Sequence, residues 1–368
     1  MNSSKKTISN YIQMKKIFLP VLLILFMAFQ CCTSKTQRSR KPVSTVSLTP
    51  DGKNYIYNQS IQVTVKTKIH DGELKEARLF LNNELLTVSD QLEFSYTIDQ
   101  LTHTGLNTLK VVAVKSDDNS NTRLHNFTVL SEKPPQRYNY RIVKEYPHST
   151  EHFTQGLEFH NGYLFEGTGE HGKSGIYKTD YPSGRILQSQ KLSNQYFGEG
   201  ITILKDKLYQ LTYKSQIGFV YRVSDFAVVD SFRFESKEGW GLTNDGNFLI
   251  MSDGTETLTW INPEDYSIEK KIQVVDHQKV WPYINELEYD NGFIWANVWT
   301  TNQIIRIDAA NGKVTGIADL EGILSVMHAS QAYRIDVLNG IALHPKTGNL
   351  FVTGKLWPKM FELELLPE

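Results

Sequence analysis

The sequence contains little cysteine and almost no net charge. Its only two cysteines, Cys31 and Cys32, are adjacent, so the rest of the chain cannot form a disulfide. Lys and Arg number 39 against 40 Asp and Glu, which leaves no basic excess for binding nucleic acid. We therefore expect neither a disulfide scaffold nor a nucleic-acid-binding protein.

Long apolar runs and metal-binding spacings are also scarce. The main apolar run, residues 17–29, is too short to span a membrane comfortably. The 10 histidines are scattered, and no His/Cys/Asp cluster has the spacing of a zinc site, so we predict no metal and no cofactor. His148 and His152 are interpreted as structural or rim residues.

The N-terminus has the pattern of an export signal. Two lysines precede the apolar run, and the cysteines and a polar stretch follow it. A cysteine directly after such a run resembles the lipid-modified cysteine of bacterial lipoproteins. We predict a signal peptide over residues 1–32 with lipidation of Cys31 or Cys32. The protein is then exported, periplasmic or at the cell surface, and contacts the membrane only through a lipid anchor; plain secretion is the alternative.

Two regions with different sequence patterns follow a polar linker at residues 33–43. Residues 44–132 contain short alternating runs separated by Asp-Gly, Asn-Asn and Asp-Asp-Asn turns. This spacing predicts a small β-sandwich, immunoglobulin-like by pattern alone, because no Cys-Trp-Cys signature is present. A proline-containing stretch, EKPPQR, then leads into a second domain at residues 138–368.

The second domain contains five repeats. The aligned stretches are TQGLEF, GEGITI, GWGLTN, INELEY and LNGIAL, and their third residues recur at intervals of 41 to 54 residues. A turn and a second apolar strand follow each stretch. Four short strands per period of this length form one blade of a β-propeller. We therefore predict an all-β protein, a five-bladed β-propeller preceded by the immunoglobulin-like β-sandwich.

Equivalent residues of the repeats gather around the axis of a propeller, because the innermost strand of each blade lines the central channel. The second residues of the five stretches are Gln155, Glu199, Trp240, Asn285 and Asn339. Two positions earlier, three repeats have Phe153, Phe197 and Tyr283. The ends of the second strands add Tyr213, Asp253, Trp299 and Lys355. We expect an aromatic cup with polar groups at its base, which is the usual form of a small-ligand site.

These residues carry a resemblance to a known family. The stretches EHFTQGLEF, YFGEGITILKDKLYQLTYK, EGWGLT, INELEYDNGFIWANVW and NGIALHPKTGNLFVTGKLWPK resemble the plant and bacterial type of glutaminyl-peptide cyclotransferase. The similarity covers residues 138–366 and leaves out the sandwich. It implies a five-bladed propeller enzyme of the acyltransferase class. Such an enzyme cyclises the N-terminal glutamine of a peptide or protein to pyroglutamate, with release of ammonia and without a catalytic metal.

The resemblance also implies roles for the site residues. Glu199 takes the position of the catalytic glutamate, and one carboxylate between two nitrogens can move a proton from one to the other. Asn285 and Lys355 fall where the family keeps groups that stabilise a developing negative oxygen and orient the substrate. The predicted substrate-binding residues are Phe153, Gln155, Phe197, Tyr213, Trp240 and Trp299. The family commonly has tryptophan at the position of Tyr213.

Two other functions fit parts of the pattern. Glu199, Asp253, Asn285 and Asn339 could share an axial calcium ion, as in a propeller lactonase or esterase, but Lys355 would repel that ion. Alternatively, the propeller is a non-catalytic surface binding module. Asp253 also fits a simple turn residue, and Asn339 fits a hydrogen bond to the neighbouring blade.

Overall fold

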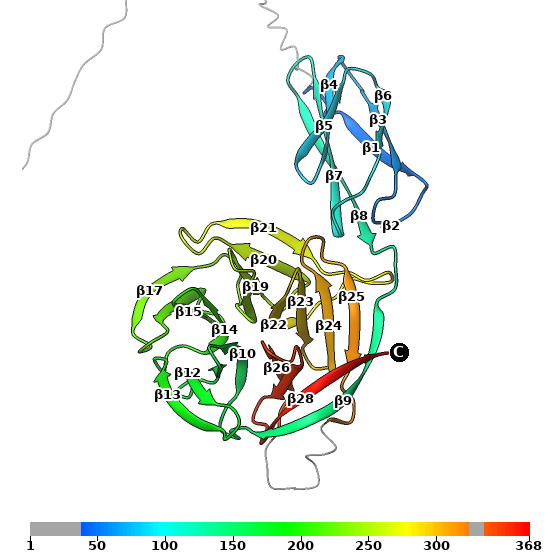
Figure 1. Cartoon of the computed structure of the whole chain (residues 1–368). Coiled ribbons are helices and arrows are strands. Elements are labelled where there is room, and N and C mark those ends of the chain that lie inside the picture. The colour runs from blue at the N-terminus through cyan, green and yellow to red at the C-terminus, as the bar shows by residue number, and fades with distance from the viewer. Residues whose placement is uncertain (1–37, 324–334) are drawn as a thin grey trace, which may run out of the picture. The chain divides into compact units, whose positions relative to one another are not determined.

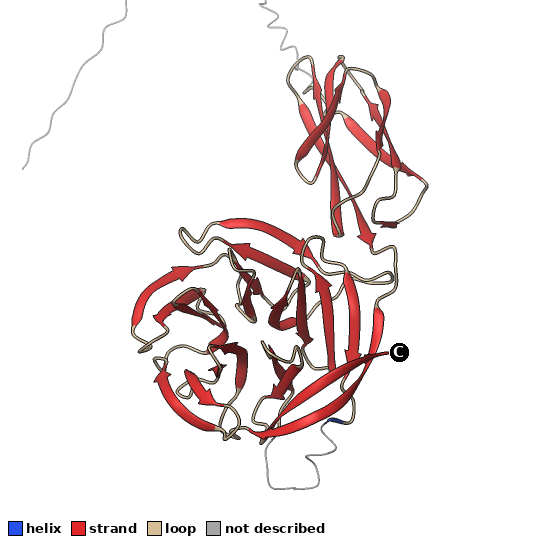
Figure 2. Cartoon of the chain, in the orientation of Figure 1, coloured by secondary structure: helices blue, strands red, loops and turns tan. Residues whose placement is uncertain are grey.

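The computed structural model describes residues 38–323 and 335–368 (Figure 1). These residues form strands joined by turns and loops, with no α-helix in either range; the short blue segment in Figure 2 corresponds to a 3₁₀ position at Ile323. No helix among them is long and apolar enough to cross a membrane. The predicted signal peptide and the lipidation candidates Cys31 and Cys32 lie outside the described residues.

Two sheets enclose a hydrophobic core in the N-terminal part of the described chain. The three-stranded sheet, in the order β1-β3-β6, consists of β1 (Val43–Thr49), β3 (Ile61–Lys68) and β6 (Glu93–Ile98). The five-stranded sheet, in the order β2-β8-β7-β4-β5, consists of β2 (Asn54–Ile56), β8 (Ser120–Leu130), β7 (Gly105–Lys115), β4 (Leu74–Leu81) and β5 (Glu84–Ser89). Because side chains alternate along a strand, Val63, Leu79 and Phe127 point into one core from three strands of the two sheets.

Three four-stranded antiparallel sheets follow, each built from consecutive strands. The first consists of β10 (Thr154–His160), β11 (Tyr163–Thr168), β12 (Gly175–Asp180) and β13 (Arg185–Lys191). The second consists of β14 (Gly198–Leu204), β15 (Lys207–Thr212), β16 (Ile217–Arg222) and β17 (Val228–Arg233). The third consists of β18 (Leu242–Asn244), β19 (Leu249–Ser252), β20 (Thr257–Ile261) and β21 (Ile268–Gln273).

The remaining strands form one eight-stranded sheet in the order β22-β23-β24-β25-β9-β28-β27-β26. Its members are β22 (Ile284–Asp290), β23 (Phe293–Val298), β24 (Gln303–Asp308), β25 (Val314–Asp319), β9 (Gln136–Pro147), β28 (Lys359–Pro367), β27 (Leu350–Gly354) and β26 (Leu338–Leu343). β9 pairs in parallel with β25 and antiparallel with β28. As Figure 1 shows, β9 runs along β28 and so completes the last repeat as its outer strand.

The first strands of the five repeats surround a common centre. β10, β14, β18, β22 and β26 contact one another in this order, and β26 contacts β10 in turn. Apolar side chains fill the space between consecutive sheets; Phe165 and Ile176 of the first four-stranded sheet, for example, pack against Ile201 and Tyr221 of the second. Burial of apolar surface between sheets therefore holds the ring together.

Glycines allow the inner strands to approach one another closely. A Cβ atom on Gly200 would lie 2.5 Å from the backbone nitrogen of Leu242 and 2.6 Å from the carbonyl oxygen of Trp240. A Cβ atom on Gly241 would lie 2.0 Å from the carbonyl oxygen of Asn285. Only glycine fits these positions, which explains why the axial residues Glu199 and Trp240 are each followed by one.

We expect Gly200→Ala to destabilise the protein by about 1–3 kcal/mol, because the added methyl group meets backbone that cannot move aside. Denaturant unfolding followed by tryptophan fluorescence measures this change. Gly52→Ala is the control: its Cβ would have no neighbour nearer than 3.6 Å, and the change should stay within about 0.5 kcal/mol. Equal stability of the two variants would contradict the packing argument.

Candidate active site

One cavity beside the inner strands collects the predicted catalytic and substrate-binding side chains. It is lined by Phe153, Gln155, Phe197, Glu199, Tyr213, Trp240, Asn285, Trp299 and Lys355. Its volume of about 130 Å³ lies below the roughly 300–1,000 Å³ of pockets that enclose drug-sized ligands. The cavity therefore suits one small group, such as a single amino-acid side chain.

Three polar residues of the cavity lie at irregularities of their strands. The pairing of β14 with β15 is interrupted at Glu199 and Gly200. The pairing of β10 with β11 is interrupted at Gln155, and that of β22 with β23 at Asn285. Such β-bulges re-aim side chains and are common next to active sites. The bulges therefore account for the orientation of these three side chains toward the cavity.

Glu199 and Lys355 carry opposite charges in a nearly dry environment. Glu199 is 4% exposed and Lys355 6% exposed, and within the two described ranges neither side chain has a hydrogen-bond partner. Burial raises the pKa of Glu199 well above its usual value; the Lys355 charge opposes this rise and the Glu238 charge adds to it. Burial lowers the pKa of Lys355, and the negative charges of Glu199 and Asp336 oppose this fall. Both groups are thus available to a ligand.

The amide side chains at the cavity also keep hydrogen-bonding atoms available. Asn339 Nδ2 donates to the side-chain oxygen of Gln155 (3.1 Å) and to the carbonyl oxygen of Thr154 (2.9 Å). This leaves the amide nitrogen of Gln155 to donate elsewhere. Asn285 Oδ1 is buried without a hydrogen-bond partner among the described residues. Because an unpaired buried acceptor costs stability, a bound polar ligand would relieve this cost.

Phe197 is the centre of one aromatic wall of the cavity. Its ring centroid lies 6.1 Å from that of Phe153 and 5.8 Å from that of Tyr213. Gly169 makes room for this wall, since a Cβ there would lie 2.4 Å from the Phe197 ring. The Lys355 amine lies 4.7 Å from the centroid of Phe153, a cation–π contact that stabilises its charge.

Two tryptophans form the other wall. The rings of Trp240 and Trp299 lie 5.4 Å apart and nearly perpendicular. Trp240 packs on Gly254, where a Cβ would lie 2.6 Å from the ring. Trp240 Nε1 donates to Glu238 Oε2 at 3.0 Å, which fixes the rotation of the indole. This hydrogen bond holds one face of the cavity in place.

Three residues that the repeat spacing groups with the site do not line the cavity. Tyr283 is 51% exposed, and its left-handed backbone (φ 65°) ends the alternation that the spacing assumes. Asp253 accepts hydrogen bonds from the backbone and hydroxyl of Thr255, as a turn residue does. Asn339 donates a hydrogen bond to Gln155 and does not itself line the cavity. Of the four residues considered for a shared axial calcium ion, Asp253 and Asn339 therefore do not line this cavity, whereas Glu199 and Asn285 do.

Sequence reasoning does not identify Glu238, although its charge acts on Glu199. Glu238 also forms an ion pair with Lys214, at 3.4 Å. The available signal is its position: Glu238 stands two residues before Trp240, where two other repeats have Phe153 and Phe197.

Within the described ranges, one group of imidazole and carboxylate side chains is compact enough to surround an ion. It consists of His148, His152 and Glu166, whose ligand atoms lie within 4.8 Å of one another. None of the three lines the cavity. This group is therefore separate from the candidate active site.

Comparison with known proteins gives concordant matches. The glutamine cyclotransferase family model matches residues 109–365, beginning within β7 and thus earlier than residue 138, where the resemblance was expected to start. The glutaminyl-peptide cyclotransferase of Arabidopsis thaliana is 41% identical over 225 residues, which cover 61% of this chain and 70% of that protein. The crystal structure of the Myxococcus xanthus glutaminyl cyclase is similar with a TM-score of 0.60 and 35% identity, and the match covers 64% of this chain and 99% of that one.

Proposed function

The chain belongs to the glutamine cyclotransferase family and cyclises N-terminal glutamine to pyroglutamate with release of ammonia, and from this premise we propose that the reaction takes place in the aromatic cavity with Glu199 as the proton carrier. One observation carries the proposal. Glu199, Asn285 and Lys355 line a single small cavity between aromatic walls, whose volume of about 130 Å³ suits one amino-acid side chain such as that of glutamine.

Glu199 performs both proton transfers of this mechanism. The α-amine of the substrate attacks the carbon of its own side-chain carboxamide and must lose a proton. The bond from that carbon to the amide nitrogen then breaks, and the nitrogen must gain a proton to leave as ammonia. The Glu199 carboxylate accepts the first proton and donates it to the leaving nitrogen, so the enzyme returns to its starting state. The raised pKa of Glu199 favours this role, because it makes the carboxylate a stronger base.

Lys355 and Asn285 stabilise charge and orient the reacting groups. The carboxamide oxygen becomes negative during attack, and a fixed cation in a dry cavity stabilises that charge strongly. We assign this role to the Lys355 amine, with the amide nitrogen of Asn285 as a second donor. The unpaired Asn285 Oδ1 is suited to accept a hydrogen bond from the attacking amine.

The other cavity residues select the cyclisation conformer. Gln155, fixed by Asn339, presents its amide nitrogen to the substrate. The aromatic walls exclude water and leave room only for a folded side chain, which brings the amine to the carboxamide carbon and reduces the entropic part of the barrier. Tyr213 replaces a tryptophan common in the family and so changes the shape of one wall.

Mass spectrometry of three peptides that differ only at the N-terminus tests this function. A peptide with free N-terminal glutamine should lose the mass of one ammonia. The N-acetylated peptide lacks the attacking amine, and the N-terminal asparagine peptide would have to close a strained four-membered ring, so both should stay unchanged. Deamidation of the acetylated peptide would instead identify a hydrolytic amidase.

Glu238→Gln should move the acid limb of the kcat/KM profile to lower pH. The negative charge of Glu238 raises the pKa of Glu199, so its removal lowers that pKa and keeps Glu199 ionised at lower pH. Glutamine can still accept the hydrogen bond from Trp240, and the plateau rate should be retained. The substrate amine, with an ordinary pKa of about 7.7–8.0, titrates identically with both enzymes, so the difference between their profiles isolates Glu199. An unmoved limb, or a shift to higher pH, would refute the coupling.

We also propose a finer description of the fold. The five inner strands are the first strands of five propeller blades, and β9 is the outer strand of the last blade. We interpret the two N-terminal sheets as an immunoglobulin-like sandwich over residues 44–132, followed by the propeller domain at residues 138–368. The sheet order and the ring of inner strands support this reading.

We further propose that the protein is exported and anchored by a lipid on Cys31 or Cys32. The support is the basic and apolar pattern of residues 1–32. Metabolic labelling with a radioactive fatty acid should modify the wild-type protein. It should leave the double Cys31→Ser, Cys32→Ser variant unlabelled.

A further inference from the structure

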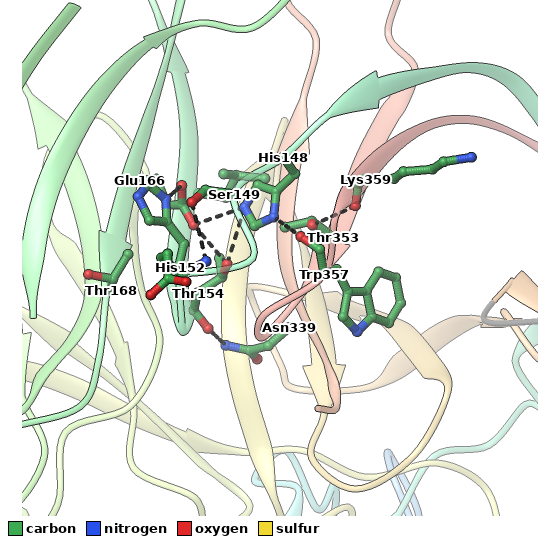
Figure 3. Close-up of polar contacts among 12 residues, drawn as sticks. His148, Ser149, His152, Thr154, Glu166, Thr168, Asn339, Thr353, Trp357 and Lys359 are labelled. Carbon is green, nitrogen blue, oxygen red and sulfur yellow. Dashed lines mark hydrogen bonds and ion pairs between the residues drawn. The ribbon is translucent and has the colours of Figure 1, made fainter. Parts of the chain in front are cut away.

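A buried cluster of two imidazoles and a carboxylate takes no part in the mechanism above (Figure 3). His148 and His152 belong to the loop between β9 and β10, and Glu166 is on β11. Their side chains are 5%, 7% and 4% exposed, respectively. Charged groups this deeply buried need partners, and the cluster supplies most of them itself.

The hydrogen bonds of the cluster define the protonation of His148. Its Nδ1 lies 2.6 Å from the carbonyl oxygen of Trp357, and its Nε2 lies 3.1 Å from Glu166 Oε1 (Figure 3). Carbonyl and carboxylate oxygens only accept hydrogen bonds, so both ring nitrogens of His148 donate and the ring is an imidazolium. His152 Nδ1, at 2.6 Å from Glu166 Oε2, and the hydroxyl of Thr154, at 2.7 Å from Glu166 Oε1, complete the environment of the carboxylate.

The electrostatics agree with this assignment. Burial alone would lower the pKa of His148, but Glu166 and the Trp357 carbonyl outweigh burial and leave the pKa above its ordinary value. Burial would raise the pKa of Glu166, and the two imidazoles instead hold it well below its usual range. A further titratable neighbour, Tyr177, packs against the His152 ring in a tilted arrangement with centroids 4.2 Å apart.

The Trp357 carbonyl belongs to the tight turn that carries Lys355. The backbone nitrogen of Trp357 donates to the carbonyl oxygen of Gly354 at 3.1 Å and closes the turn. Within it, Leu356 adopts a left-handed conformation with φ 63°, which disfavours any residue with a side chain. A turn of this kind persists only where surrounding contacts hold it.

The loop that contains the histidines provides these contacts. The backbone nitrogen of Leu356 donates to the carbonyl oxygen of His152 at 2.8 Å, and that of His148 donates to the carbonyl oxygen of Pro358 at 3.0 Å. The His148 ring adds the third bond, to Trp357. The same loop ends at Phe153, whose ring faces the Lys355 amine.

We propose that His148 is a positioning residue for the cyclisation: anchored on Glu166, its imidazolium holds the Trp357 carbonyl and thereby fixes the turn that presents the Lys355 amine to the cavity. This inference rests on the proposed role of Lys355. The cluster acts through Lys355 and does not touch the substrate.

A matched pair of variants separates the two hydrogen bonds of the His148 ring. Asparagine places a donor near the position of Nδ1 and can keep the bond to Trp357, whereas glutamine reaches toward Glu166 and loses that bond. We expect His148→Asn to keep kcat within a few-fold. His148→Gln should lower kcat by on the order of 10²-fold with KM little changed, because a displaced amine fails mainly in the transition state. Equal activity of the two variants would overturn the inference.

A double-mutant cycle with Lys355→Met shows whether His148 acts through the amine. If it does, His148→Gln has almost no further effect on kcat once Lys355 is absent. Multiplicative losses would reject the inference even if each variant is folded. Full activity of Lys355→Met alone would reject the proposed role of Lys355 instead, so the two failures are distinguishable.

The protonation state is tested without turnover. Nitrogen NMR of the full-length wild-type protein at neutral pH should show His148 with both ring nitrogens protonated. A neutral His148 ring would overturn the assignment. So would a bound zinc ion, seen as one zinc per chain by elemental analysis together with loss of the imidazolium signal when zinc is added.

Discussion

Glu199→Gln should lower kcat by on the order of 10²–10⁴-fold, the usual contribution of general acid–base catalysis, and leave KM nearly unchanged. Glutamine has almost the same size as glutamate and can still accept hydrogen bonds, so the cavity and its aromatic walls should persist. It cannot take a proton from the attacking amine or deliver one to the leaving nitrogen. Steady-state release of ammonia from a peptide with N-terminal glutamine measures both constants.

The matched control for this variant is Glu235→Gln. Glu235 is exposed on the surface and pairs with Lys271 at 3.5 Å, so the variant removes the same charge away from the cavity. We expect it to retain wild-type kinetics. If Glu199→Gln instead raises KM with unchanged kcat, Glu199 binds the substrate and does not move its proton.

Lys355→Met should lower kcat by on the order of 10²–10³-fold, as expected for the loss of one group that stabilises a developing oxyanion. Methionine fills a similar volume, and a buried amine that no longer has to be kept charged removes a desolvation cost, so the fold should tolerate the change. Activity and thermal unfolding should be measured on the same preparation, which separates lost chemistry from lost structure.

The same variant should change the pH profile in a defined direction. The positive charge of Lys355 lowers the pKa of Glu199. Its removal leaves burial and Glu238 to raise that pKa further, so the acid limb of kcat/KM should move to higher pH, opposite to the shift expected for Glu238→Gln. Lys355→Arg keeps the charge and should move the limb little. Shifts of the same sign for Lys355→Met and Glu238→Gln would contradict the electrostatic account.

The repeat pattern was sufficient to group the nine side chains that line the cavity, although it also grouped Tyr283, Asp253 and Asn339 with them. Equivalent positions of a closed ring share one environment, so residues as far apart as Phe153 and Lys355 could be placed in one cavity without knowledge of any contact. This prediction depends only on the repeat period, which can be read from the sequence without any knowledge of the structure.

What the sequence could not predict depends on hydrogen bonds between distant residues. The bulges at Gln155, Glu199 and Asn285 depend on the register of neighbouring strands. A glycine follows Gln155 and Glu199, but Glu286 follows Asn285, so this signal marks only two of the three. Tyr283 does not line the cavity, because its left-handed backbone just before β22 breaks the simple alternation; its ring lies outside, 6.1 Å from that of Trp299. His148 and His152 were interpreted as structural or rim residues because no zinc spacing includes them; the bonds of His148 to Trp357 and Glu166 join distant parts of the chain and leave no sequence signal.

Side-by-side mass spectrometry of the wild-type protein and Glu199→Gln, with a peptide of free N-terminal glutamine in excess EDTA, tests whether Glu199 carries the proton. We expect the wild-type protein to convert the peptide to the product lacking one ammonia, and the variant to leave it intact over the same time. Conversion by both proteins would show that Glu199 is not the proton carrier. An intact peptide in both, with conversion restored by a divalent cation, would show that the reaction depends on a metal.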